Sequence, residues 1–262
     1  MRIGLLQFAP QPGEVRANLD HIGGALSGVH ADLMVLPELC TTGYLFVSRH
    51  QLAQLSESVP GGPTCEAMAK LSRDTRAAIV WGMPVLSGQR IFNSAVMVTP
   101  QGEFHVYHKA HLFVDEKDLF DPGDSPFPVF DFGSVKVGML VCFDHFFPEA
   151  ARSLALHGAQ IICHPSNLVL EYAQTNSITR AVENRVFWIL ANRTGSETLG
   201  EKTLTFIGRS QILAPDGRLL ARASPDSEEL LVAEIDPAEA LNKKVTPRND
   251  LFLDRRTDLY SA

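Results

Sequence analysis

The chain has 262 residues, of which 45% are hydrophobic and 20% are charged, as is ordinary for a folded globular protein. This composition excludes wholesale disorder, collagen and coiled coil. A formal charge of −7 disfavours nucleic acid as the main partner, because phosphate binding requires a basic surface. Four cysteines are too few for a disulfide-rich scaffold, and the length allows one large domain or two small ones.

The N-terminal segment predicts neither export nor a membrane span. The apolar run over residues 3–8 is short and meets Pro10 and Pro12, unlike the apolar region of a signal peptide. No other run reaches the roughly 18 apolar residues that a transmembrane helix requires. We therefore expect a cytoplasmic protein whose cysteines stay reduced.

Strand-like and helix-like segments alternate to the end of the chain, as hydrophobic periodicity and turn residues indicate. We predict helices over 18–28, 64–75, 148–157 and 174–185. Single strands are predicted over 3–8, 33–36, 77–83 (stopped by Pro84), 135–141, 160–164, 186–191 and 230–235. Two hairpins are predicted, 92–99 with 103–108 and 206–213 with 217–223.

This interleaving favours an α/β layered fold with mixed sheets. No Ser/Gly/Pro-rich linker divides the chain, so we expect a single domain over residues 1–262. The polar segment 237–262 resembles a surface tail. It is interpreted either as a segment that docks on a partner subunit or as a loosely held terminus.

Three predicted strands end in residues that carry chemistry. Cys142 follows an apolar strand just before a helix start, where a nucleophile can project beside free backbone N–H groups, although small buried cysteines are also common in cores. Glu38 follows the strand 33–36 and would suit a general base if buried; the alternative is a solvated strand end. Lys109 could hold an oxyanion or be a surface charge at a hairpin end.

Together, these segments resemble the signatures of the nitrilase, or carbon–nitrogen hydrolase, superfamily. The resemblance rests on the Pro-Glu turn at 37–38, on HKAHL at 108–112, on VCFDHFFPE at 141–149 and on AVENR at 181–185, in the family's order and over essentially the whole chain. The resemblance implies a four-layer α-β-β-α sandwich with two mixed sheets. It also implies a homodimer or a higher oligomer.

The resemblance also implies roles for individual residues. Cys142 would be the nucleophile, Glu38 the general base, and Lys109 with the Phe143 backbone N–H the oxyanion stabiliser. Glu116 matches a second glutamate of the family that would orient Lys109, the alternative being a loop carboxylate. The nearby cation of Lys109 is expected to favour the Cys142 thiolate.

The expected reaction converts a small neutral amide into a carboxylic acid and ammonia through a thioacyl-enzyme. Family members that act on carboxylates often carry an arginine after the nucleophile, but residues 145–147 here are His-Phe-Phe. Nitriles and N-carbamoyl amines remain alternatives, as does a catalytically weak interaction module. The residues expected to bind substrate in an aromatic pocket, together with Phe46, are Tyr44, Phe113, Phe143, His145 and Asn167.

Other motifs do not support a rival chemistry. The remaining cysteines, Cys40, Cys65 and Cys163, lack C-x-x-C spacing, and the sequence holds no glycine-rich nucleotide motif, so we expect no metal and no cofactor. His105 and His111 flank His108 at three-residue steps, but on a hairpin and loop where that spacing does not converge.

Overall fold

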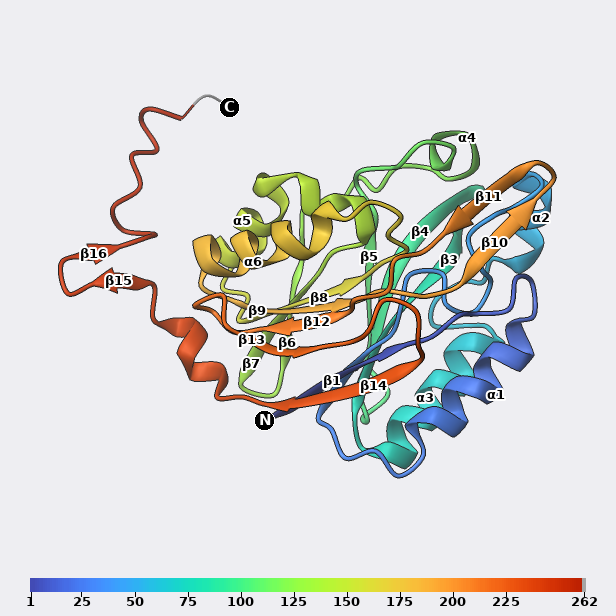
Figure 1. Cartoon of the computed structure of the whole chain (residues 1–262), viewed down its shortest axis with the longest axis horizontal. Coiled ribbons are helices and arrows are strands. Elements are labelled where there is room, and N and C mark those ends of the chain that lie inside the picture. Colours follow the sequence, from blue (N-terminus) through green and yellow to red (C-terminus); the bar gives the residue numbers. More distant parts are fainter. Residues whose placement is uncertain (261–262) are drawn as a thin grey trace.

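The computed structural model describes residues 1–260 and contains two six-stranded sheets packed face to face (Figure 1). The first sheet has the order β14-β1-β2-β3-β4-β5. Its β1 pairs in parallel with β2, which pairs in parallel with β3, and its other pairings are antiparallel. The strands are β1 (Arg2–Gln7), β2 (Leu33–Val35), β3 (Ala78–Ser87), β4 (Arg90–Val98), β5 (Phe104–His108) and β14 (Glu229–Glu234).

The second sheet has the order β13-β12-β9-β8-β7-β6 and is also mixed. Its parallel centre is β7-β8-β9, and antiparallel strands flank it on both sides. The strands are β6 (Val129–Phe132), β7 (Val135–Met139), β8 (Ile161–Pro165), β9 (Phe187–Ala191), β12 (Gln211–Leu213) and β13 (Leu219–Arg222).

Helices cover the outer face of each sheet. In Figure 1, α1 (Val15–Leu26) and α3 (Pro63–Thr75) lie outside the first sheet, and α5 (Pro148–Leu156) and α6 (Tyr172–Asn184) lie outside the second. The layer order is therefore α-β-β-α, and the expected fold class is confirmed.

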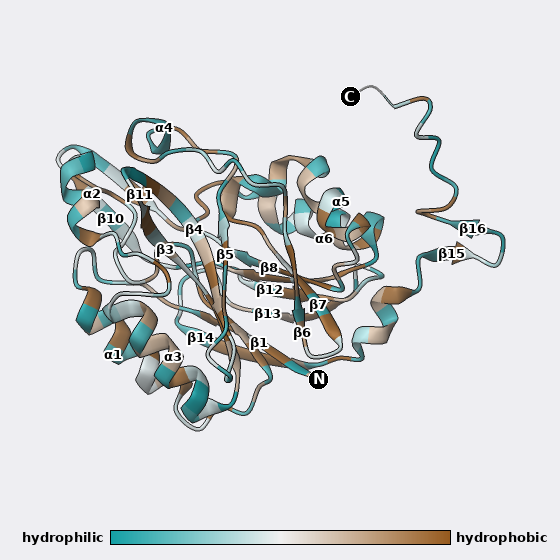
Figure 2. Cartoon of the chain, turned by 180° about the vertical axis from the view of Figure 1, so that it is seen from behind, coloured by the Kyte–Doolittle hydropathy of each residue, from teal (hydrophilic) through white to brown (hydrophobic). Residues whose placement is uncertain are grey.

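Strand alternation divides the first sheet between two cores, because successive side chains point to opposite faces. Ile3 and Leu5 face the second sheet, whereas Leu6 joins Ile22 and Met68 under the helices. Figure 2 shows hydrophobic residues along the strands of both sheets, while α1 and α3 alternate between hydrophilic and hydrophobic residues. Burial of these apolar faces, at about 25 cal/mol per Å², is the main force that holds the layers together.

Shorter elements complete the described chain. They are α2 (Arg49–Leu55), α4 (Glu116–Leu119), the hairpin of β10 (Ser196–Leu199) with β11 (Lys202–Thr205), the 3-10 helices Cys142–Phe146 and Pro237–Leu241, and the hairpin of β15 (Lys244–Thr246) with β16 (Asn249–Asp250). Within residues 1–260, no helix is both long and apolar enough to cross a membrane.

Two predicted strand boundaries are wrong. Pro84 does not stop β3, which continues to Ser87. The Pro84 carbonyl accepts from the Glu57 N–H (3.3 Å), on the side away from β4, so the missing N–H of the proline costs no ladder bond to β4. The predicted strand 206–213 is present only over Gln211–Leu213, because Gly208 and Arg209 both have positive φ and bend the chain.

Candidate active site

Strand ends from both sheets place the three candidate catalytic side chains together. Glu38 follows β2, Lys109 follows β5 of the same sheet, and Cys142 follows β7 of the second sheet. Their exposed fractions are 0%, 1% and 5%. The interpretations of Glu38 as a solvated strand end and of Lys109 as a surface charge are therefore wrong.

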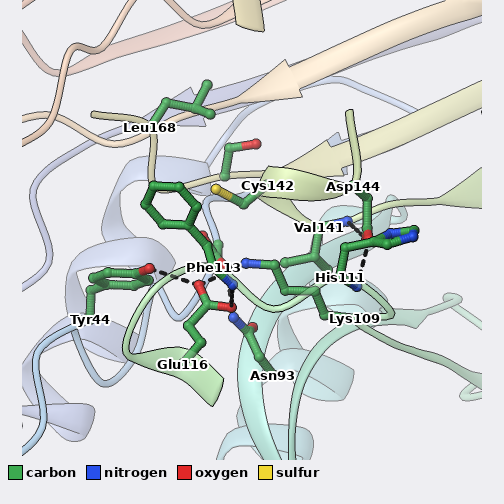
Figure 3. Close-up of polar contacts among 12 residues, drawn as sticks. Tyr44, Asn93, Lys109, His111, Phe113, Glu116, Val141, Cys142, Asp144 and Leu168 are labelled. Carbon is green, nitrogen blue, oxygen red and sulfur yellow. Dashed lines mark hydrogen bonds and ion pairs between the residues drawn. The ribbon is translucent and has the colours of Figure 1, made fainter. Parts of the chain in front are cut away.

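The Lys109 ammonium lies between the carboxylates of Glu38 and Glu116, and Figure 3 shows it beside Glu116. Its Nζ is 2.9 Å from Oε1 of Glu38 and 2.8 Å from Oε1 of Glu116, and all three side chains are buried. Burial opposes the charge on Lys109, but the carboxylates of Glu116 and Glu38 outweigh burial and raise its pKa above the ordinary value. Lys109 is therefore a permanent cation at neutral pH.

Glu38 has one oxygen held and one oxygen free. Its Oε1 accepts from the Asn93 amide (2.6 Å) and from Lys109, whereas Oε2 is buried without a hydrogen-bond partner within residues 1–260. Burial raises the pKa of Glu38 above its ordinary 4.5, although Lys109 works in the opposite direction. The free oxygen of a carboxylate with a raised pKa is suited to accept a proton from a nearby acid.

Cys142 starts the 3-10 helix Cys142–Phe146 with a backbone φ of 42°. Residues other than glycine rarely adopt this left-handed conformation, and its cost concentrates at functional sites. Burial and the Glu38 charge raise the pKa of the thiol well above 9.0, and Lys109 offsets only part of this effect. Lys109 thus favours the thiolate, as expected, but burial and Glu38 outweigh it, so the thiol must lose its proton on attack.

The Asp144 carboxylate holds the turn that carries Cys142. It is fully buried and accepts from the Val141 N–H (3.0 Å), the His111 N–H (3.1 Å) and the Tyr107 hydroxyl (2.8 Å). The first hydrogen bond within the 3-10 helix is donated by the Asp144 N–H to the Val141 carbonyl. The Phe143 N–H before it therefore has no partner within the helix.

Two adjoining hollows open beside these groups. A recess of about 20 Å³ is lined by Cys142, Phe113, Phe143, His145 and Asn167. A cavity of about 420 Å³ is lined by Tyr44, Phe46, Phe113 and Glu116. Phe113 lines both, and Figure 3 shows its ring beside the Cys142 sulfur.

The polar residues of the recess differ in what they offer to a ligand. The side-chain nitrogen and oxygen of Asn167 are buried without a partner among residues 1–260. Burial lowers the pKa of His145 to about 4, so this ring is neutral at physiological pH. The structure thus places Asn167 and His145 at the recess. Tyr44 lines the larger cavity instead, and its hydroxyl donates to Glu116 (2.7 Å).

Apart from Glu116, the residues that support the site were not predicted from the sequence. Asn93 and the adjacent Ser94 are buried polar residues within the otherwise largely apolar β4, and this is the signal that could have found Asn93. Glu197 and Arg193 form a buried ion pair, and the Glu197 carboxylate also accepts from the backbone N–H groups of Tyr44 and Leu45 (2.9 and 2.8 Å). This pair anchors the loop that carries Tyr44.

The three histidines at three-residue spacing and the other cysteines lie outside this cluster. His105 packs against Phe130, and His108 stacks on Phe92. His111 stacks on Phe147, on the far side of Asp144 from Cys142 in Figure 3. The other thiols, Cys40, Cys65 and Cys163, are free and buried, and burial raises the pKa of each.

The chain belongs to the carbon–nitrogen hydrolase family, whose sequence profile matches residues 2–242. It is 42% identical to a nitrilase of Pyrococcus abyssi over 99% of each chain. It is also 35% identical to an (R)-stereoselective amidase of Pseudomonas sp., over 98% of this chain and 92% of that protein. The protein is therefore a carbon–nitrogen hydrolase by family, as its sequence signatures indicated.

Solved structures agree with this assignment. The crystal structure of an amidase from Nesterenkonia sp. has a TM-score of 0.81 and 30% sequence identity, and covers 99% of this chain and 94% of that chain. A variant of that amidase carries the product of Michael addition of acrylamide at its active-site cysteine. Another variant was solved in complex with butyramide.

Proposed function

We propose that this protein hydrolyses a small neutral amide to a carboxylic acid and ammonia through a thioacyl-enzyme on Cys142. The observation that carries the proposal is that the two carboxylate oxygens of Glu38 have different environments. Asn93 and Lys109 hold one carboxylate oxygen, and the other is left without a partner in residues 1–260, within the electrostatic reach of the Cys142 thiol. A neutral thiol beside a free carboxylate oxygen requires only one proton transfer to become a nucleophile.

In the acylation half, the Cys142 sulfur bonds to the amide carbon while its proton passes to Oε2 of Glu38. The carbonyl π electrons move onto oxygen, and this oxyanion is stabilised by Lys109 Nζ and the Phe143 N–H. When the oxyanion collapses, the C–N bond breaks, and the proton on Glu38 passes to the departing nitrogen as ammonia forms.

In the deacylation half, water attacks the thioester carbon and Glu38 takes one water proton. The second tetrahedral oxyanion collapses, the C–S bond breaks, and the proton returns to the sulfur of Cys142. The acid leaves and the resting thiol is restored. Glu116 accepts from Lys109 and from Tyr44, so we assign it the task of orienting the Lys109 cation.

The charges around the larger cavity favour a substrate without a carboxylate. Among described residues lining it, the cationic side chain is Lys202, and Asp115 already pairs with it. Glu116 is paired with Lys109, and Asp118 adds negative charge that would repel an anionic substrate. We therefore assign Tyr44, Phe113, Phe143, His145 and Asn167 to binding of a neutral amide, with the smaller recess nearest the reacting carbon.

The test is an ammonia-release panel of amides, N-carbamoyl compounds and nitriles, with the acid products identified by mass spectrometry. We expect turnover of neutral aliphatic or aromatic amides and little turnover of amides that carry a carboxylate. Absence of ammonia release from every amide would refute the proposal.

Two other substrate classes are supported by specific observations. The nitrilase of Pyrococcus abyssi is 42% identical to this chain, so nitriles are the second candidate. The excess of carboxylates around the larger cavity would also suit the amino group of an N-carbamoyl amine. The same panel separates these classes by which substrate has the highest kcat/KM.

A non-catalytic interaction module is the alternative from a different class. Electrophile labelling separates it from an enzyme, because an activated Cys142 should react far faster than Cys40, Cys65 or Cys163. Equal labelling of all four thiols would contradict an activated nucleophile.

We also propose that the chain assembles as a homodimer or higher oligomer through its C-terminal segment. After Leu241 this segment projects away from the sandwich (Figure 1) and exposes Leu253 (84%) and Leu259 (68%). Exposed leucines on a projecting segment favour cover by a second copy. Light scattering after chromatography should give at least twice the mass of 28.8 kDa, and L253S/L259S should lower it. A monomeric wild type would contradict this assignment.

We also propose a cytoplasmic location for the protein, which cell fractionation would test.

A further inference from the structure

A buried histidine forms a hydrogen bond with the peptide unit that follows the proposed nucleophile. His164 lies on β8 and is fully buried, and its Nε2 is 2.8 Å from the Cys142 carbonyl oxygen. On the other side of the ring, Nδ1 is 3.2 Å from Nε1 of Trp188 on β9. The three groups form a chain from the interior of the second sheet to the site.

The donor inventory fixes the tautomer of His164. The indole N–H of Trp188 only donates, so Nδ1 of His164 must accept from it. The ring proton therefore sits on Nε2 and is donated to the Cys142 carbonyl oxygen, which only accepts. Burial lowers the pKa of His164 to about 3, so the ring stays neutral and keeps this arrangement at physiological pH.

Because the peptide bond is planar, the hydrogen bond to the Cys142 carbonyl also affects the Phe143 N–H on the other side of it. The Cys142 carbonyl and the Phe143 N–H belong to one planar trans peptide unit and point in opposite directions. A hydrogen bond that fixes the carbonyl therefore also fixes the direction of the N–H. The Cys142 φ of 42° lies in a region that side-chain-bearing residues rarely occupy, so this peptide needs external support.

We propose that His164, held in one tautomer by Trp188, is a positioning residue that aims the Phe143 N–H at the oxyanion. The hydrogen bond to the carbonyl also withdraws electron density from the peptide, which strengthens the N–H as a donor. This inference rests on the proposed function, because the Phe143 N–H acts on an oxyanion only if acyl transfer occurs at Cys142.

Two reactions of the same thiol separate this role from simple packing. Hydrolysis of an amide passes through a tetrahedral oxyanion. Alkylation by iodoacetamide forms a C–S bond and expels iodide at a saturated carbon, so no oxyanion develops. A residue that serves the oxyanion should affect the first reaction and spare the second, whereas damage to the fold or to Cys142 should slow both.

The variants are His164→Phe, which keeps a ring but removes the donor, and His164→Gln, whose amide nitrogen can reach the position of Nε2. Trp188→Phe removes the N–H that sets the tautomer. Ile162→Val, a buried substitution on the same strand, is the packing control.

For His164→Phe we expect kcat to fall about 100-fold, the size of losing one oxyanion donor, with KM and the alkylation rate of Cys142 changed by less than about 3-fold. His164→Gln should recover most of kcat, Trp188→Phe should fall between the two, and Ile162→Val should match the wild type.

Full kcat in His164→Phe, or an alkylation rate that falls in parallel with kcat, would overturn the inference. Should His164→Phe fail to fold, Trp188→Phe decides by the same comparison of kcat with alkylation. A wild type that releases no ammonia from any amide would instead refute the proposed function, so the two failures are distinguishable.

Discussion

At the scale of single residues, the candidate site holds two negative charges and one positive charge out of water. Glu38 and Glu116 share the Lys109 ammonium, and breaking such a buried group by removing one partner is strongly unfavourable. The arrangement leaves Cys142 as a neutral thiol, because burial and Glu38 outweigh Lys109. The proposed reaction therefore begins with a proton transfer to Glu38.

Replacement of Glu38 by glutamine should remove the base while keeping the shape of the side chain. We expect kcat for ammonia release to fall by about 10²–10⁴, the usual contribution of a general base. Circular dichroism should show a retained fold, and iodoacetamide should still reach Cys142. Turnover within a few-fold of the wild type would rule out Glu38 as the base.

The pH dependence of kcat/KM follows from the raised pKa of Glu38. The base must be ionised, so kcat/KM should fall as the pH decreases through a pKa above the ordinary 4.5. His145, with a pKa of about 4, stays neutral over this limb and does not produce it. A kcat/KM that stays constant down to pH 4.5 would contradict a buried, desolvated base.

The candidate catalytic residues and the orienting Glu116 were predicted from the sequence, but Asn93 and Asp144, which hold them, were not. Glu38, Lys109 and Cys142 stand out because each ends a strand within a recognisable signature. Asn93 and Asp144 act through hydrogen bonds between segments far apart in the chain, at separations of 55 and 37 residues. No local pattern encodes such pairs, so the tertiary fold had to be known first.

At the scale of elements, tight turns at strand ends position the functional groups. Cys142 and Leu39, the residue after Glu38, both have positive φ. Gly82 of β3 lets the Glu38 turn approach closely: a Cβ there would lie 2.3 Å from the Glu38 Cα. The Gly82 N–H donates to the Pro37 carbonyl (3.0 Å), and its carbonyl accepts from the Cys40 N–H (3.1 Å).

Gly82→Ala should therefore displace Glu38. We expect a loss of about 1–3 kcal/mol in the free energy of unfolding, as for other overpacked positions, together with a fall in kcat. Gly23→Ala is the matched control, because nothing lies within 4 Å of its added Cβ and it sits inside α1. The measurements are urea unfolding and ammonia release, and a Gly82→Ala protein equal to wild type in both would refute this role.

Element prediction worked where periodicity was strong. Most strands and helices of the two main layers match predicted segments, because their apolar faces are buried. The edge strand β6, whose residues are only partly buried, was not predicted. The β10–β11 hairpin was missed, since β11 reads Lys-Thr-Leu-Thr with its residues largely exposed. Leu199, Lys202 and Leu204 of this hairpin line the larger cavity. This is a tertiary feature that the local sequence does not display.

At the scale of the whole molecule, the two sheets share one apolar core. Ile3 and Val80 of the first sheet and Met139 and Ile189 of the second belong to the same buried cluster. The site lies across these two layers, since Glu38 and Lys109 follow strands of one sheet and Cys142 follows a strand of the other. This arrangement supports the expectation of a single domain.

We therefore expect one cooperative unfolding transition in urea. Tryptophan fluorescence should report both layers, because Trp81 packs under α1 and α3 and Trp188 lies on β9. Fluorescence, circular dichroism and ammonia release should be lost together at one midpoint. Separate midpoints would indicate that the layers fold as independent domains.

A thioacyl-enzyme on Cys142 can be trapped by acid quenching during turnover of a good amide substrate, followed by mass spectrometry of the peptide that contains Cys142. We expect a mass increase equal to the amide minus ammonia on Cys142. It should be absent in Cys142→Ala, which should release no ammonia. Ammonia release that persists in Cys142→Ala would show that Cys142 is not the nucleophile.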